Sequence, residues 1–246
     1  MELTTRLYLQ DDHCFEAEAT VVAVRGKLLA FDRTCFYPGG GGQPPDEGSV
    51  TLQSGESLRI ASVHADQDGI IWHHSTSALP PGIIGQRVRL ALNEEKRCAL
   101  ARYHTVLHVL NTIVLRDYAG WITGAQIAAD YSRIDFKLER FSAALCTDLE
   151  GKVNAVLAGS HAVRSYYISE AEFKLRGDLL RTLEVRPPVS NGQVRVVEIQ
   201  GFDAQACGGT HAHNTSEVGR FSIFRTENKG KNNKRLYVRL DRIVTD

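Results

Sequence analysis

The chain has 246 residues, of which 43% are hydrophobic and 24% are charged, a balance typical of folded globular proteins. Basic and acidic residues are equal in number, so the net charge of zero argues against a protein that coats nucleic acid through bulk charge. No apolar run approaches the ~20 residues of a membrane span, and the first residues lack the pattern of a secretory signal. Five scattered cysteines fit the reducing cytosol. We therefore expect a cytoplasmic protein with no membrane partner.

The segment 1–92 predicts a small β domain. Short runs of alternating apolar and polar residues are separated by turn signals such as Ser54-Gly55 and Asp68-Gly69. Many short strands at regular spacing, with turns between them, are typical of a small barrel or sandwich.

The pattern changes at residue 93, where helical spacing begins. Asn93 is a candidate N-cap for a long helix, and Gly120 fits its end. Two further helices are expected, one over 141–159 and one that begins at a capping box on Ser169. Strand-like segments alternate with these helices, so residues 93–246 predict an α+β domain.

Two pairs of residues, about a hundred positions apart, indicate a metal site. His104 and His108 are four apart on the first predicted helix, so both imidazoles can reach one point. Cys207 and His211 enclose two glycines in the loop CGGTH, and those glycines allow a tight turn. Each pair alone is weak evidence, because two histidines on a helix are more often structural. Together the pairs offer three imidazoles and one thiolate, a set that suits tetrahedral Zn²⁺.

The residues alone leave the role of this metal open. A closed four-ligand site stabilises a fold without chemistry, whereas ligands drawn from distant segments favour a pocket. A zinc-protease helix is rejected because Thr105 stands where its glutamate would be. His213 is a spare candidate ligand, to which we assign no metal role.

The glycine-rich segment TCFYPGGGGQPPDEG, residues 34–48, is a second unusual feature. It is not a phosphate-binding P-loop, because no lysine follows the last glycine. It fits either a flexible hairpin loop or a backbone that comes close to a ligand or another domain.

Several motifs in order carry a resemblance to a known family. RYHTVLHVLN, GAQIAADYSRIDF, DLEGKVN and ACGGTHAHNTSEVG together resemble the editing domain of alanyl-tRNA synthetase, and the glycine-rich segment resembles the motif that precedes that domain. Without the synthetase's other domains, the chain resembles the freestanding alanyl-tRNA editing proteins (the AlaX family), in the form with an N-terminal barrel.

The resemblance implies an α+β protein in two parts: a small β-barrel domain with the glycine motif over 1–92, and a zinc-containing editing domain over 93–246. It implies an aminoacyl-tRNA deacylase that hydrolyses the ester of mischarged tRNA(Ala), with serine as the expected cargo and glycine as a second one. Such proofreading has a physical reason, because a pocket sized for alanine cannot strongly reject an isostere that merely adds a hydroxyl.

The resemblance also assigns roles to residues. The zinc ligands would be His104, His108, Cys207 and His211. Either a zinc-bound water would be the nucleophile or zinc would hold the aminoacyl group, and no side-chain base is assigned. The expected substrate contacts are Thr123, Gln126, Gly41, Gly42 and Gln43.

A basic segment near the end of the chain is the expected contact with the acceptor end of the tRNA. Residues 225–242 hold seven basic and two acidic residues. Phosphate contacts are expected from Lys229, Lys231, Lys234 and Arg235. Two other functions remain open: a non-catalytic tRNA-binding module stabilised by zinc, and an editing deacylase of the threonyl type.

Overall fold

The computed structural model describes residues 4–139, 142–181, 187 and 189–241. By their contacts the residues form two compact units, a smaller one of Met1–Gly40 with Pro44–Cys98 and a larger one of Gly41–Gln43 with Ala99–Asp246. This division falls inside the first long helix rather than at its start. It also assigns the tip of the glycine-rich segment, Gly41–Gln43, to the larger unit.

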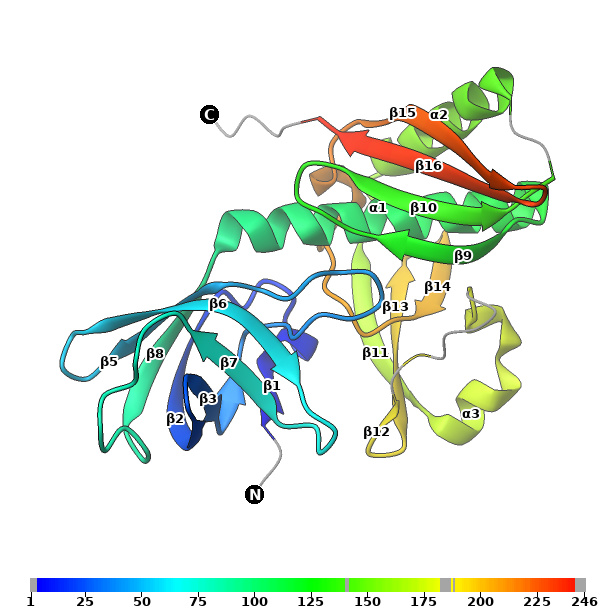
Figure 1. The fold of residues 1–246 in the computed structure, drawn as a ribbon. Helices are drawn as coiled ribbons and strands as arrows, with labels where there is room; N and C mark the ends of the chain where they lie inside the picture. The colour runs from blue at the N-terminus through cyan, green and yellow to red at the C-terminus, as the bar shows by residue number, and fades with distance from the viewer. Residues whose placement is uncertain (1–3, 140–141, 182–186, 188, 242–246) are drawn as a thin grey trace. The chain divides into compact units, whose positions relative to one another are not determined.

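The smaller unit is built on a closed barrel of antiparallel strands in the order β2-β3-β7-β6-β5-β8 (Figure 1). The barrel strands are β2 (Glu16–Arg25), β3 (Leu28–Phe31), β5 (Gly48–Leu52), β6 (Ser57–Ala65), β7 (Ile71–Ser75) and β8 (Arg87–Leu92). A short parallel pair, β1 (Thr5–Arg6) with β4 (Arg33–Thr34), lies outside the barrel. Alternate residues point inward, as in β8, where Val88, Leu90 and Leu92 are buried in the barrel core. The predicted small barrel is therefore confirmed.

In its described residues, the larger unit combines two sheets with three α-helices (Figure 1). One sheet has the order β15-β16-β10-β9, and the other has the order β11-β13-β12 with β14 also paired to β13. The strands are β9 (Trp121–Gln126), β10 (Ser132–Lys137), β11 (Val163–Ser169), β12 (Val189–Ser190), β13 (Gln193–Ile199), β14 (Asp203–Ala206), β15 (Phe221–Gly230) and β16 (Asn233–Leu240). The helices are α1 (Glu94–Tyr118), α2 (Ala143–Ala158) and α3 (Glu170–Leu175). The predicted α+β class is confirmed.

Helix α1 begins and ends for local reasons that the sequence partly reveals. Asn93 Oδ1 accepts the backbone N–H of Lys96 at 3.0 Å, so the predicted N-cap is present. At the other end, the left-handed residue is Ala119, with φ of 52°, and not Gly120. Gly120 is instead a site of close packing, since a Cβ there would lie 2.7 Å from Leu138 Cδ2.

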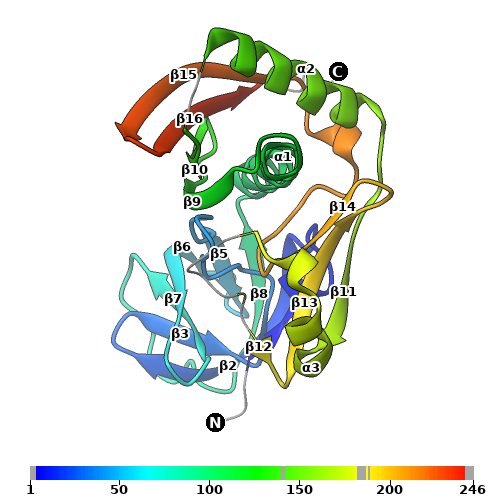
Figure 2. The same cartoon turned by 90° about the vertical axis from the view of Figure 1, so that its right-hand side faces the viewer.

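The core of the larger unit surrounds α1. One hydrophobic cluster joins α1 to the β15-β16-β10-β9 sheet, to α2 and to β13, through residues that include Val109, Leu236 and Val197. Figure 2 shows α1 between the two sheets, with α2 on the same side of the β15-β16-β10-β9 sheet as α1. None of the helices that the structure describes in this unit covers the other face of that sheet. None of the helices within the described residues is both long and apolar enough to cross a membrane.

Serine caps begin the other two helices, and the sequence predicted the one at Ser169. Ser142 Oγ accepts the N–H of Leu145 at the start of α2, and Ser169 Oγ accepts the N–H of Glu172 at the start of α3. Helix α2 is tied to β15 by Asn154, whose side chain bonds both the N–H and the carbonyl of Phe221.

Candidate metal centre

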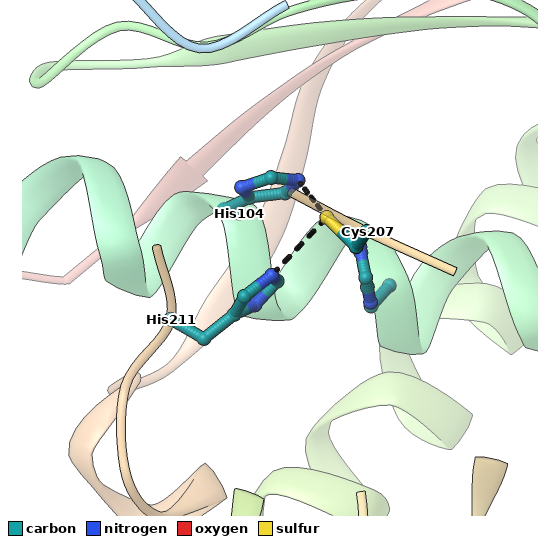
Figure 3. Close-up of side chains that lie close together, drawn as sticks. His104, Cys207 and His211 are labelled. Carbon is teal, nitrogen blue, oxygen red and sulfur yellow. Dashed lines mark hydrogen bonds between the residues drawn. The ribbon is translucent and has the colours of Figure 1, made fainter. Parts of the chain in front are cut away.

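The structure brings together the two residue pairs that the sequence singled out. One potential ligand atom from each of His104, His108, Cys207 and His211 lies within 4.8 Å of all the others. Cys207 Sγ is 3.5 Å from both His104 Nε2 and His211 Nε2 (Figure 3). The histidines of α1 lie one turn apart, while the other two residues come from the loop that follows β14. All three imidazoles are buried and the thiol is partly buried.

Gln43 fixes the orientation of one imidazole. Its Oε1 accepts the backbone N–H of Thr210 at 3.1 Å, and its Nε2 donates to Thr210 Oγ1 at 2.8 Å. Since a backbone N–H can only donate, the oxygen of the Gln43 amide must face the loop. The same oxygen lies 2.9 Å from His104 Nδ1, which must therefore carry the proton. This tautomer leaves the lone pair on His104 Nε2, the atom that faces Cys207.

Thr105 makes an equivalent contact with a second imidazole. Its Oγ1 accepts the N–H of Ala212 at 3.1 Å and lies 3.2 Å from His211 Nδ1. A hydroxyl can donate as well as accept, so the ligand role decides the direction of this bond: a His211 ring that presents the Nε2 lone pair toward Cys207 carries its proton on Nδ1, and Thr105 Oγ1 accepts it. Hydrogen bonds of this kind behind metal-binding imidazoles fix the ring and its tautomer. Thr105, rejected as a catalytic base by its chemistry, instead supports a candidate ligand.

The ligand loop is held by close packing and by a buried arginine. A Cβ on Gly209 would lie 2.2 Å from His104 Cε1 and 2.9 Å from Gln43 Oε1, so only glycine fits there. Neither glycine of CGGTH has a positive φ. Space for the imidazole, rather than the expected conformational freedom, therefore explains Gly209. Arg195 on β13 is buried and donates to the Gly209 carbonyl at 2.7 Å, which ties the loop to the sheet.

The electrostatics of the centre favour metal binding. Burial, with a smaller contribution from the charge of Arg195, lowers the pKa of His104 to about 3. Burial first, and the neighbouring imidazoles and arginines second, also hold the pKa values of His108 and His211 well below the usual range. The imidazoles are thus neutral and can donate lone pairs. Gly209 N–H lies 3.5 Å from Cys207 Sγ, a contact that stabilises negative charge on sulfur. Three nitrogens and one sulfur fit a zinc-type ion by donor chemistry.

The predicted substrate contacts lie in different surroundings. Gly41 and Gly42 are exposed, and the Gly42 carbonyl accepts the N–H of Ile127 at 2.8 Å, so the loop tip lies against the end of β9. Thr123 and Gln126 are exposed side chains of β9 whose partners are Asn233 and Arg133, at 3.0 and 2.8 Å. Their substrate roles stay predictions.

Gln43 differs from the other predicted substrate contacts, because it is buried beside the imidazoles. From the sequence, the resemblance implied only that Gln43 contacts the substrate. The partners that define its position come from α1 and from the loop after β14. Its substrate role also stays a prediction.

The four predicted RNA contacts also differ among themselves. Lys234 is buried, and its ammonium donates to Asn228 Oδ1 and to the carbonyls of Gly230 and Lys231. Arg235 forms two hydrogen bonds to Asp135, at 2.7 and 2.8 Å. Lys229 lies 3.4 Å from Glu227, and Lys231 is exposed at the turn before β16. Their RNA roles stay predictions, and Arg242 of the basic segment lies outside the described residues.

The fold and the centre together define an α+β protein that offers a Cys/His₃ site between a helix and a loop. Comparisons with known proteins agree with this class. Residues 194–237 match the family described as threonyl and alanyl tRNA synthetase second additional domain.

Relatives match along nearly the whole chain. The chain is 35% identical over 244 residues to the alanyl-tRNA editing protein AlaX-M of Methanosarcina mazei, covering 97% of each chain. It is 30% identical to the AlaX-M protein of Saccharolobus solfataricus, covering 96% of this chain and 98% of the relative. It also matches the alanine–tRNA ligase of Thermofilum pendens at 36% identity, over 24% of that longer protein. The chain belongs to the AlaX-M family of alanyl-tRNA editing proteins.

Proposed function

We propose that this protein is a deacylase that hydrolyses the ester of mischarged tRNA(Ala), with Ser-tRNA(Ala) as its main substrate and Gly-tRNA(Ala) as a second one. The observation that carries the proposal is the buried Cys/His₃ centre, with its imidazoles oriented by Gln43 and Thr105, in a chain whose relatives are named for alanyl-tRNA editing.

The residues of the centre have distinct tasks in this proposal. His104, His108, Cys207 and His211 hold a zinc ion. When bound there, zinc would supply Lewis-acid chemistry, by polarising the ester carbonyl or lowering the pKa of a water molecule. Gln43 holds the His104 ring, while Thr123 and Gln126 on neighbouring β9 contact the aminoacyl group.

Two observations favour competing functions, which the assay must therefore distinguish from the proposed one. Four protein ligands are the number that a purely structural zinc site has, which favours a non-catalytic tRNA-binding module. The matching family description also names threonyl synthetases, which favours the threonyl type. The relatives with alanyl names cover nearly the full chain, and this coverage supports the alanyl type.

A deacylation assay tests the proposal. The purified protein would be incubated with Ser-tRNA(Ala), Gly-tRNA(Ala), Ala-tRNA(Ala) and Ser-tRNA(Thr), and the loss of each ester would be followed. We expect rapid loss of Ser-tRNA(Ala) and background loss of Ala-tRNA(Ala). Equal background rates for every substrate would reject the enzyme, and a preference for Ser-tRNA(Thr) would favour the threonyl type.

A pair of cysteine variants separates catalysis from structure. Cys207→Ser removes the thiolate of the centre, whereas Cys146→Ser changes a cysteine on α2 that lies outside the four-residue centre. We expect Cys207→Ser to lose bound zinc and activity while circular dichroism shows a folded chain, and Cys146→Ser to keep both. A Cys207→Ser protein that loses zinc and keeps full deacylase activity would reject the role of the metal.

A further inference from the structure

The free face of the β15-β16-β10-β9 sheet carries a cluster of aromatic and arginine side chains. We propose that this face is a docking platform for an unpaired RNA strand, namely the single-stranded 3′ end of the tRNA. The choice of tRNA as the source of the strand rests on the proposed function. The cluster comprises Tyr131, Phe224, Tyr237, Arg225 and Arg239 and is called the aromatic platform below.

The alternation of β16 places part of the platform on the free face. Its even-numbered residues from Lys234 to Leu240 are buried, and Leu236, Val238 and Leu240 belong to the hydrophobic cluster that includes α1. The odd-numbered residues Arg235, Tyr237 and Arg239 therefore point away from α1, toward the face of the sheet that carries none of the described helices (Figure 2).

A β-bulge adds further side chains to this face. The register between β15 and β16 shifts between Ile223 and Arg225, so Phe224 is an extra residue in its strand. A bulge re-aims side chains relative to regular alternation. Phe224 thus lies 44% exposed beside Tyr237, which Arg225 also covers.

The rings and arginines of the platform contact one another. The centroids of Tyr131, Phe224 and Tyr237 are 6.0 to 6.3 Å apart. Arg225 lies over the Tyr237 ring at 4.7 Å, and Arg239 lies over the Phe224 ring at 4.5 Å. Tyr131 is also 39% exposed. Exposed rings with guanidinium groups over them are the kind of surface on which unpaired bases stack.

The strand register connects the platform to the metal centre. Gln126, Arg133, Tyr237 and Arg225 lie opposite one another across β9, β10, β16 and β15. At a strand spacing of ~4.8 Å, this row runs for roughly 14 Å across the sheet. Its β9 end adjoins the Gly42 loop tip, whose neighbour Gln43 bonds His104. A strand laid along the row would lead toward the centre.

The charge of the free face suits a polyanion. Cations at its outward positions are Arg133, Lys137, Arg225, Arg235 and Arg239, against the carboxylates Asp135 and Glu227. Asp135 is engaged by Arg235, and Glu227 accepts the Tyr237 hydroxyl at 2.9 Å. Arg225 lies 3.7 Å from Glu227, so Arg133, Lys137 and Arg239 remain to meet phosphates while the rings meet bases. This combination favours RNA over an apolar protein partner.

Binding measurements that combine a substitution in the protein with a truncation of the RNA test the aromatic platform. Binding of uncharged tRNA(Ala) transcripts, with and without the unpaired 3′ nucleotides, would be measured by fluorescence anisotropy for the wild type and for Phe224→Ala. We expect the variant to bind the intact transcript on the order of tenfold more weakly, since stacking on one ring commonly contributes that much. We expect it to bind the truncated transcript as the wild type does.

Three further variants test whether RNA binding depends on aromatic stacking at Phe224. Phe224→Trp keeps an aromatic face and should bind normally, whereas Phe224→Leu keeps apolar contact without stacking and should bind like Phe224→Ala. Tyr166→Ala removes an exposed ring from β11 in the other sheet and should leave binding unchanged. Thermal unfolding and zinc content would establish that each variant is folded.

The outcomes distinguish the platform from its alternatives. Equal weakening for both transcripts, or no weakening for either, would overturn the proposal. So would a change of sedimentation on Phe224→Ala without a change in RNA affinity, because that result assigns the face to a protein partner. Because the transcripts are uncharged, a coupled loss of binding supports the platform even if the deacylation assay rejects the proposed reaction.

Discussion

Replacing Gln43 with methionine tests whether metal affinity depends on a residue that does not itself bind the metal. Methionine has a similar volume but cannot accept the proton of His104 Nδ1 or the N–H of Thr210. The His104 ring would lose the bond that fixes its tautomer, and the buried Thr210 N–H would lose its acceptor.

The size of the effect follows from these lost bonds. Removal of a hydrogen-bond partner behind a metal-binding imidazole commonly lowers metal affinity by 10–100-fold, or about 1.4–2.8 kcal/mol. The orphaned N–H of Thr210 adds a cost of about 1–3 kcal/mol to folding with or without metal. Gln43→Met should therefore bind zinc at least about tenfold more weakly and unfold at lower urea concentration.

Competition with a chromophoric chelator would measure zinc affinity, and the visible spectrum of the Co²⁺-loaded protein would report ligand geometry. Gln43→Glu is an informative partner, because a carboxylate still accepts from His104 and should largely preserve affinity. Gln200→Met, at an exposed glutamine, is the matched control. Zinc affinity in Gln43→Met equal to that of the wild type would refute the orienting role.

Other substitutions make equally direct predictions. Arg97 Nε bonds the buried Asp46 carboxylate at 3.1 Å, so Arg97→Met leaves that carboxylate without its cation and should lower the free energy of unfolding in urea by about 3–5 kcal/mol. Adding Asp46→Asn should recover much of this loss. A double variant no more stable than Arg97→Met would contradict this account of the ion pair. Burial lowers the pKa of His73 to about 3, so below pH ~6.5 the unfolded state binds more protons than the folded state, and the free energy of unfolding falls by about 1.4 kcal/mol per pH unit as the pH drops toward 3. Between pH 6.5 and 4.5, the free energy of unfolding of His73→Gln should therefore depend less steeply on pH than that of the wild type, by about that amount. An unchanged slope would count against this assignment. Gly209→Ala places a methyl group 2.2 Å from a ligand imidazole and should abolish tight zinc binding. Gly151→Ala should not, because its new Cβ would have no atom within 4 Å apart from its chain neighbours and the backbone of its own helix. Normal chelator competition by Gly209→Ala would show that the ring can move aside.

Those parts of the structure that depend on local pattern could be predicted from the sequence. Alternation predicted the barrel strands, and the caps at Asn93 and Ser169 marked helix starts, because each signal lies within a few residues of its effect. The pairs on α1 and in CGGTH also formed local patterns, so their chemistry indicated a common metal.

Contacts between distant segments were less accessible. Nothing in the glycine-rich segment reveals that Gln43 reaches a helix 61 residues later. In the basic segment, charge alone made Lys234 and Arg235 look equivalent. Alternation could have separated them, since Lys234 shares its parity with Leu236 and Val238 and therefore faces the core. The pairing of Arg235 with Asp135 depends on strand register, which the sequence does not give.

The contacts behind the ligands come from separate parts of the larger unit. Gln43 belongs to the glycine-rich loop, Thr105 to α1 and Arg195 to β13, and each fixes an imidazole or the loop that carries one. A centre assembled in this way reaches its final geometry only when all three segments are docked. Metal binding and folding of this unit are therefore linked, because an ion that binds the assembled ligands stabilises every contact that orients them. The same linkage is the reason to expect that Gln43, far from the ligands in sequence, affects their affinity for the metal.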